Sequence, residues 1–215
     1  MRMATTTTLG YDELPSLLTR LTGDEKHDRS AFSTLDVLWV LYDRILGEDD
    51  RFLLSKGHGP TAFYAVLAAK GILPVDELDG FGGFDSPLGH HPDRTLVPGV
   101  EISSGSLGHG LPIAVGAALM GRRVYVLVGD GELDEGSNWE AVQWAGRIGL
   151  APLTAVVVDN HSSTYHWPGG IEGRFELEGW TSAHADGRDH DALERAFRAR
   201  TGDAPHVVVA EVERR

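Results

Sequence analysis

Three short, almost continuously apolar runs constrain the fold of this chain more than any other feature of its sequence. They are rich in valine and span Val124–Val128, Ala155–Val158 and Val207–Ala210. Runs of this kind are typical of parallel strands that are buried on both faces of a sheet. Helical patterns at Asn138–Ile148 and Asp191–Arg200 lie between them. The alternation predicts a doubly wound α/β fold, with a mostly parallel sheet and helices on both faces.

The N-terminal half of the sequence shows helices and loops instead of Val-rich runs. Apolar residues at helical spacing predict a helix over Leu35–Leu46, with Ser33 or Thr34 as its cap. A second, Ala-rich helix is predicted over Thr61–Lys70. Residues 74–104 are dense in Gly, Pro and His. That composition indicates an ordered loop region of the kind that carries active-site residues.

The chain of 215 residues is long enough for one well-buried domain, and no repeat or change in composition divides it. We expect residues 1–23 to form an N-terminal segment, partly disordered and containing a short helix. Residues 24–215 are then expected to fold as a single domain.

The charge of the chain bears on its partners. Asp and Glu number 32 against 19 Lys and Arg, a formal net charge of −13. A surface this acidic argues against nucleic acid or an anionic membrane as the main partner. There is no cysteine, and neither a signal-like start nor an apolar run of membrane-spanning length is present. The cytoplasm is therefore the expected location.

Polar residues follow two of the apolar runs at the point where each predicted strand ends. Gly129-Asp130-Gly131 ends the first, and Asn160 ends the second. Neighbouring parallel strands lie about 5 Å apart, so the carboxylate and the amide oxygen could meet at one hard cation. Mg²⁺ is usually held by one or two protein groups together with substrate phosphates, and the glycines let the backbone approach phosphate oxygens. A simple strand-ending turn is the alternative.

Longer motifs resolve that choice, because they occur together and in order. The segment Gly129–Gly136 followed by Trp139-Glu140-Ala141 resembles the thiamine-diphosphate signature of transketolases. Other segments resemble the two cofactor loops of the same family: Ser55–His58, His91-Pro92-Asp93, Pro98–Glu101 and Ser104–Gly108. The resemblance covers residues 24 to 212. It implies that the domain binds thiamine diphosphate and Mg²⁺ in the pyrophosphate-binding fold of this family.

The resemblance also implies roles for individual residues. Asp130, Asn160 and the carbonyl of Ser162 would bind Mg²⁺, whereas Gly131 and His58 would contact the diphosphate. The backbones of Gly105 and Leu107 would meet the aminopyrimidine. The whole set implied for cofactor binding is His58, Gly105, Ser106, Leu107, Gly129, Asp130, Gly131, Glu132, Asn160 and Ser162.

Histidines and acidic residues complete the expected site. The resemblance implies that His27, His58 and His91 face the substrate and transfer protons near neutral pH. A lone histidine is more often structural, and the position of His27 follows only from counting through residues 23–29. Glu135 and Glu140 match acidic residues at the subunit interface of transketolases. Ordinary exposed acids at a helix start are the alternative.

The same resemblance implies a partner. Transketolases carry a separate pyrimidine-binding domain whose glutamate activates the cofactor, and no segment of this chain resembles it. We therefore expect a second, C-terminal transketolase-like subunit and an α₂β₂ heterotetramer.

The function implied is transfer of a two-carbon ketol unit from a ketose or ketose phosphate to an aldose or aldose phosphate. Residues 161–168 and 210–215 depart from the family pattern, as does Gly108-His109-Gly110. These departures leave two-carbon transfer to a carrier-protein or lipoyl thiol as an alternative. A non-catalytic cofactor-binding or regulatory subunit is an alternative of another class.

Overall fold

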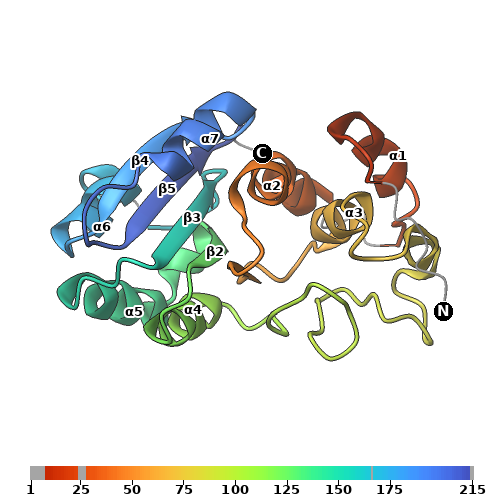
Figure 1. Cartoon of the computed structure of the whole chain (residues 1–215), viewed down its shortest axis with the longest axis horizontal. Helices are drawn as coiled ribbons and strands as arrows, with labels where there is room; N and C mark the ends of the chain where they lie inside the picture. The colour runs from red at the N-terminus through yellow and green to blue at the C-terminus, as the bar shows by residue number, and fades with distance from the viewer. Residues whose placement is uncertain (1–7, 24–27, 166, 214–215) are drawn as a thin grey trace.

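A computed structural model of the chain describes residues 8–23, 28–165 and 167–213. Its centre is a five-stranded sheet with the order β1-β2-β3-β5-β4, in which all neighbouring strands are parallel (Figure 1). The strands are β1 (Arg51–Leu54), β2 (Val124–Gly129), β3 (Leu153–Asp159), β4 (Thr181–Asp186) and β5 (His206–Glu211). The predicted α/β class and the three Val-rich strands are confirmed.

Helices cover both faces of the sheet, and successive strand residues serve opposite faces. Val156 and Val158 of β3 join one apolar core, while Ala155 and Val157 join the other. The first core is completed by α2 (Asp28–Val40), α3 (Thr61–Ala69) and α7 (His190–Arg198). The second is completed by α4 (Gly110–Leu119), α5 (Gly136–Arg147) and α6 (Gly170–Leu177). This two-sided burial is why the strands read as continuous apolar runs.

The predicted helix boundaries need one correction. α2 begins at Asp28, so Ser33 and Thr34 lie inside the helix and are buried. The Thr34 hydroxyl donates to the carbonyl of Ala31 at 2.8 Å and does not cap the start of the helix. Beyond Val40 the helix continues as one π-helical stretch, η3 (Leu41–Ile45). The remaining short elements are η1 (Tyr11–Glu13), α1 (Leu14–Leu18), η4 (Val75–Gly80) and η5 (Gly131–Asp134).

The N-terminal segment packs onto the first core. Leu14, Leu17 and Leu21 are buried there, and the amide of Leu9 donates to the carbonyl of Ala69 at the end of α3 (2.8 Å). These contacts show how residues 8–21 adjoin the domain. The proposed division of the chain at residue 23 remains a prediction.

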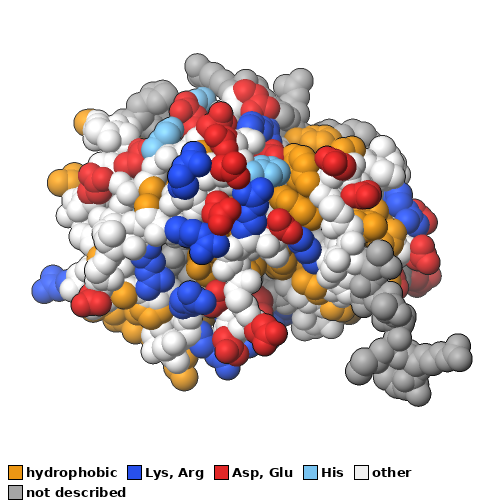
Figure 2. All heavy atoms as spheres, turned by 45° about the horizontal axis from the view of Figure 1, so that its top comes forward, with side chains coloured by type: hydrophobic (Ala, Val, Ile, Leu, Met, Phe, Trp, Pro, Cys, Tyr) orange, Lys and Arg blue, Asp and Glu red, His pale blue; other side chains and the backbone are white. Residues whose placement is uncertain are grey.

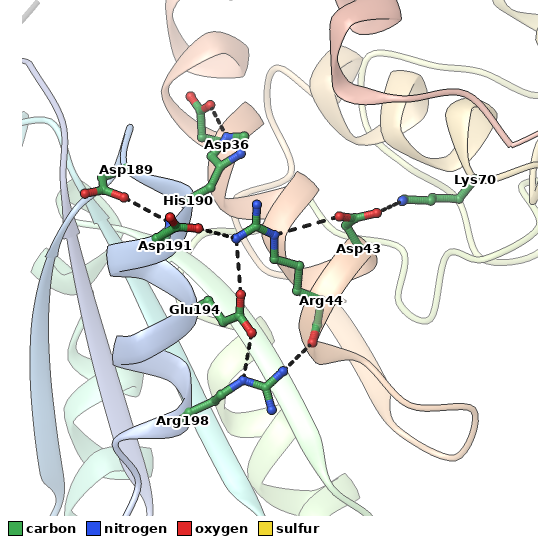
Figure 3. Close-up of polar contacts among 9 residues, drawn as sticks. All are labelled: Asp36, Asp43, Arg44, Lys70, Asp189, His190, Asp191, Glu194 and Arg198. Carbon is green, nitrogen blue, oxygen red and sulfur yellow. Dashed lines mark hydrogen bonds and ion pairs between the residues drawn. The ribbon is translucent and has the colours of Figure 1, made fainter.

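Charged side chains join the α2–η3 region to α7 (Figure 3). Arg44 of η3 donates to Asp191 at 2.7 Å and to Glu194 at 3.1 Å, both on α7. Arg198 donates to the carbonyl of Arg44 at 3.0 Å, and Asp36 of α2 pairs with His190 at 2.8 Å. The helices of the first face are thus held together by polar contacts at their surface as well as by the core.

Candidate functional site

Four loops gather at the carboxyl edge of the sheet, where α/β folds bind ligands. Residues 55–58 follow β1, residues 130–135 follow β2, and residues 160–164 follow β3. The fourth loop, residues 104–109, leads into α4. Because β2 and β3 are paired with Gly129 opposite Val158, Asp130 and Asn160 leave the sheet from neighbouring strands, as predicted.

Glycines allow the first and fourth loops to touch. A Cβ atom on Gly57 would lie 2.6 Å from the Ser104 hydroxyl, and one on Gly110 would lie 2.2 Å from Cβ of Ser55. Gly105 has φ +137°, and a Cβ there would lie 2.8 Å from the ring of His91. No larger residue fits such approaches. The structure therefore brings His91 and Gly105 together, two residues expected in the site.

Glu132 lies at the centre of these loops with only 2% of its surface exposed. Its Oε1 accepts hydrogen bonds from the Ser55 hydroxyl and from the amide of Gly108, the latter at 3.0 Å. The Ser55 hydroxyl in turn accepts from the amide of Gly110 at 3.0 Å. Burial raises the pKa of the Glu132 carboxyl. Sequence reasoning did not find this link, since its partners are distant in the chain.

Lys56 is a buried cation that interacts with the acidic residues of this region. It is 6% exposed, and its aliphatic stem lies against Gly129, where a Cβ would be 3.1 Å from the lysine Cδ. Burial lowers the pKa of Lys56 to about 8, while the charges of Glu132 and Asp130 oppose that shift. The sequence motif pointed to this loop, but gave Lys56 no role.

Asp130 is buried and accepts hydrogen bonds from the loop that follows Asn160. Its carboxylate accepts from the Ser162 amide, from the Ser162 hydroxyl at 2.7 Å, and from the Ser163 amide at 2.8 Å. Asp134 holds the next residues: it accepts from the Ser163 hydroxyl at 2.6 Å and from the Thr164 amide at 2.9 Å. Asp134 was not among the predicted site residues.

The oxygen atoms at the end of β2 and β3 fit a hard cation. The Asn160 Oδ1 atom is buried and lacks a hydrogen-bond partner among the described residues, and it follows β3 directly beside the Asp130 strand. A carboxylate, an amide oxygen and a main-chain carbonyl are ligands that Mg²⁺ accepts. No group of three or more His, Cys, Asp or Glu side chains in the described ranges could hold a metal. The expected site needs only one carboxylate.

Unpaired polar atoms concentrate in this region. Within the described residues, four buried side-chain atoms have no hydrogen-bond partner: Ser104 Oγ, Glu132 Oε2, Asn138 Oδ1 and Asn160 Oδ1. All four belong to the loops described above or to the start of α5. Buried polar groups are normally paired. Their gathering here indicates a site built to receive a ligand, an ion or ordered water.

The other predicted residues are placed as follows. His58 is half-buried in the loop after β1, and Ser106 and Leu107 are exposed in the loop before α4. Glu135 and Glu140 are exposed at the start of α5. His27 lies outside the described residues. The assigned roles of all these residues remain predictions.

A cavity of about 240 Å³ borders the site on the side of β5 and α6. Glu211 at the end of β5 pairs with His161 at 3.1 Å and with His184 at 3.2 Å. Glu172 of α6 pairs with the other nitrogen of His184 at 2.6 Å and thereby raises the His184 pKa. Among the described residues the cavity is lined by no Lys or Arg and by four carboxylates: Asp130, Asp159, Glu172 and Glu211.

Tyr165 and Trp167 are the aromatic residues that line this cavity. The Arg174 guanidinium contacts two indole rings, 3.6 Å from the centre of Trp139 and 3.5 Å from that of Trp167. These two cation–π contacts join the segment around Trp167 to α5 and α6.

The wider surface is mixed in charge. On the face shown in Figure 2, acidic side chains lie among basic ones, with no continuous basic area. Among the described helices, none has the length and apolar character needed to cross a bilayer.

Comparisons with known proteins agree with this geometry. The family model for the "Transketolase, thiamine diphosphate binding domain" matches residues 43–211. "Ferredoxin fas2" from Rhodococcoides fascians is 51% identical over 97% of this chain and 74% of its own length. An apulose-4-phosphate transketolase subunit from Actinobacillus succinogenes is 41% identical over 60% of this chain and 52% of its own length.

Among solved structures, the transketolase from Leishmania mexicana superimposes with a TM-score of 0.79 at 24% identity. The match covers 98% of this chain and 37% of that one, and shows the shared fold. This chain therefore spans about half of the apulose-4-phosphate relative and little more than a third of the solved transketolase. The family model and the site geometry together show that the chain belongs to the transketolase family and corresponds to its N-terminal, thiamine-diphosphate-binding part.

Proposed function

We propose that this chain is the thiamine-diphosphate- and Mg²⁺-binding subunit of a two-chain enzyme that transfers a two-carbon ketol unit. The donor would be a ketose or ketose phosphate and the acceptor an aldose or aldose phosphate. One observation carries the proposal: the buried Asp130 carboxylate and the unpaired Asn160 oxygen end neighbouring strands, beside loops that Glu132 joins to the end of β2.

The bound cofactor would supply the electron sink for breaking and making the carbon–carbon bond. Asp130, Asn160 and the Ser162 carbonyl would hold the metal that neutralises the diphosphate. His58 and His91 would hydrogen-bond substrate hydroxyls and move protons, as imidazoles do near neutral pH. The burial of the loops around Glu132 would keep water from the diphosphate end of the site.

A partner subunit is supported by the surface beside the site. Ile113 of α4, Met120 directly after α4 and Trp144 of α5 are 47%, 81% and 44% exposed, and these two helices contact each other. Large exposed apolar side chains in one region mark interaction surfaces. Glu140 is exposed on α5 four residues before Trp144, and so lies on the same side of the helix. This position fits its proposed place at an interface. The apulose-4-phosphate relative, which is named as one subunit of its enzyme, also supports a second chain, and an α₂β₂ assembly is the form we propose.

The acidic cavity favours a second candidate, two-carbon transfer to a carrier-protein or lipoyl thiol. Among the described residues, this space is lined by four carboxylates, two histidines and no Lys or Arg, and while the histidines are neutral it would repel the phosphate of a phosphorylated sugar. A neutral acceptor arm would meet no such repulsion. One relative is named as a ferredoxin, but this chain has no cysteine and so offers no thiolate ligand for an iron–sulfur cluster.

Co-expression with a transketolase-like subunit that carries the pyrimidine-binding domain tests both candidates. The purified complex is assayed for ketol transfer to ribose 5-phosphate, with and without thiamine diphosphate and Mg²⁺. Turnover only in the paired, cofactor-loaded sample is the expected result. Cofactor binding with transfer to a lipoyl or carrier thiol, but not to sugars, would favour the second candidate. Absence of Mg²⁺-dependent cofactor binding in the complex would refute both.

A further inference from the structure

We propose that Glu132 is a positioning residue that locks the two cofactor loops onto the end of β2 through its Oε1 atom. The inference rests on the proposed function for what those loops bind. Glu132 stands inside the family signature segment, where sequence reasoning placed it among the cofactor-binding residues. Its surroundings in the structure assign it a different task.

The contacts of Glu132 run between loops. Oε1 accepts from Ser55, 77 residues earlier in the chain, and from the amide of Gly108, 24 residues earlier. Ser55 extends the link to the Gly110 amide in the first turn of α4. A single carboxylate oxygen thus ties the loop after β1 and the loop before α4 to the turn after β2.

The segments around this oxygen are closely packed. Cβ atoms on Gly108 and Gly110 would lie 2.5 Å and 2.2 Å from the hydroxyls of Ser137 and Ser55. Glu132 is 2% exposed, and the Asn138 side-chain amide donates to its main-chain carbonyl at 2.6 Å, which joins the turn after β2 to the start of α5. The second carboxylate oxygen, Oε2, is buried and has no hydrogen-bond partner among the described residues.

Burying a carboxylate costs free energy, so a buried glutamate that links loops needs a physical explanation. Isolated ionised carboxylates are strongly disfavoured away from water unless they are paired. Here two donors converge on Oε1. The Gly108 amide is thereby fixed next to Gly105 and Leu107, whose backbones are expected to meet the aminopyrimidine. The loop is preorganised before any ligand arrives.

The positioning role separates two substitutions. Glu132→Gln keeps an oxygen that can accept from Ser55 and Gly108, whereas Glu132→Ala leaves both donors unpaired in a buried site. In the complex with the partner subunit, at saturating Mg²⁺, we expect Glu132→Ala to raise the Kd for thiamine diphosphate about tenfold or more. Glu132→Gln is expected to stay within about threefold of the parent. Glu48→Ala, at an exposed position before β1, is the matched control.

Amide hydrogen exchange on the full chain without ligand supplies a readout that does not depend on the proposed function. Exchange in the segment holding Gly108 and Gly110 should accelerate in Glu132→Ala and remain slow in Glu132→Gln. If Glu132→Ala does not fold, Ser55→Ala removes one link only, and should accelerate exchange at Gly110 most.

Three outcomes are decisive. Equal weakening of cofactor binding by Gln and Ala, with loop exchange unchanged, would overturn the proposal, because it would mean that the carboxylate charge acts on the ligand. Unchanged exchange and unchanged affinity in Glu132→Ala would overturn it as well. If the parent complex binds no thiamine diphosphate while exchange follows the expected pattern, the proposed function fails and the positioning role stands.

Discussion

The carboxylate oxygens of Asp130 accept hydrogen bonds in the structure, and they are also the proposed ligands of a metal ion. It accepts from two amides and one hydroxyl of the Ser162–Ser163 segment. A Mg²⁺ ion at Asp130 and Asn160 would draw on the same lone pairs. Asp134 keeps its own hold on Ser163 and Thr164. Asp134 would therefore still hold the segment if a metal ion replaced its contacts at Asp130.

Asp130→Asn tests the metal role at this scale. The amide removes the negative charge that a divalent cation needs, so we expect Mg²⁺-dependent binding of thiamine diphosphate to weaken about 100-fold or more. Loss of the charged acceptor should also lower the free energy of unfolding of the cation-free chain by about 1–3 kcal/mol. Calorimetry with the paired complex and urea unfolding of the chain measure the two effects. Asp203→Asn, on an exposed loop, is the control; parent-like Mg²⁺ affinity in Asp130→Asn would exclude the assigned metal site.

Residues of the site differed in how far the sequence could reveal them. Asp130 and Asn160 were predictable, because polar residues that end apolar strands fall at the carboxyl edge of the sheet. The link from Glu132 to Ser55 and Gly108 was not, since it depends on which loops the fold brings together. Asp134 likewise gained its partners from a loop about thirty residues away, with no local signal.

At the scale of secondary-structure elements, His206 joins three of them. It begins β5 and is fully buried. Its Nε2–H donates to the carbonyl of Ala196 on α7 at 3.0 Å, and its Nδ1 accepts from the Thr181 hydroxyl of β4 at 2.8 Å. The neutral imidazole therefore satisfies both contacts. Burial lowers the His206 pKa below its ordinary value.

This depressed pKa predicts how stability changes with pH. Above about pH 6.5 the histidine is neutral in both the folded and unfolded chains, so its contribution to the free energy of unfolding does not change with pH. As the pH falls below that value, the unfolded chain takes up a proton that the folded chain resists, and stability declines. We expect His206→Gln to lose about 1–3 kcal/mol at pH 7.5, and to decline less than the parent between pH 6.5 and 5. Urea unfolding at both ends of that range measures this, with exposed His109→Gln as control; parallel pH profiles for parent and His206→Gln would contradict it.

Elements that the sequence did not reveal have weak local signals. β1 has only four residues and begins with Arg51, and β4 is an edge strand of mainly small and polar residues. α4 begins at Gly110 and contains Gly116, and glycine argues locally against a helix, yet its apolar residues pack into the second core. The Val-rich strands were clear because burial on both faces removes polar residues from them.

At the scale of the whole molecule, Asp36 of α2 ties the N-terminal segment to the far edge of the sheet. Its carboxylate accepts from the Tyr11 hydroxyl, from Arg188 at 2.7 Å and from His190 at 2.8 Å. Arg188 also binds Glu213, beyond β5, at 2.9 Å. One buried side chain thus connects residues near both ends of the described chain.

Removing the Asp36 carboxylate should destabilise the packing of the helices on the first face of the sheet. Asp36→Ala leaves Arg188 and the Tyr11 hydroxyl without their shared acceptor, and removing one partner of a largely buried pair is strongly destabilising. Because Arg188 is about 30% exposed, we expect a loss of about 2–4 kcal/mol, discounted for solvent screening. Asp36→Asn keeps an acceptor oxygen and should lose about half as much. Exposed Asp85→Ala should lose nothing measurable.

Urea unfolding gives these free energies, and hydrogen exchange locates the effect. Faster exchange should appear in residues 8–21 of Asp36→Ala before the sheet opens, because that segment relies on Tyr11 for its polar attachment to α2. Stability equal to that of Asp85→Ala would show that the apolar contacts of Leu14, Leu17 and Leu21 alone hold the segment. In that case the ion pairs around Asp36 would set the geometry of the first face without contributing to its stability.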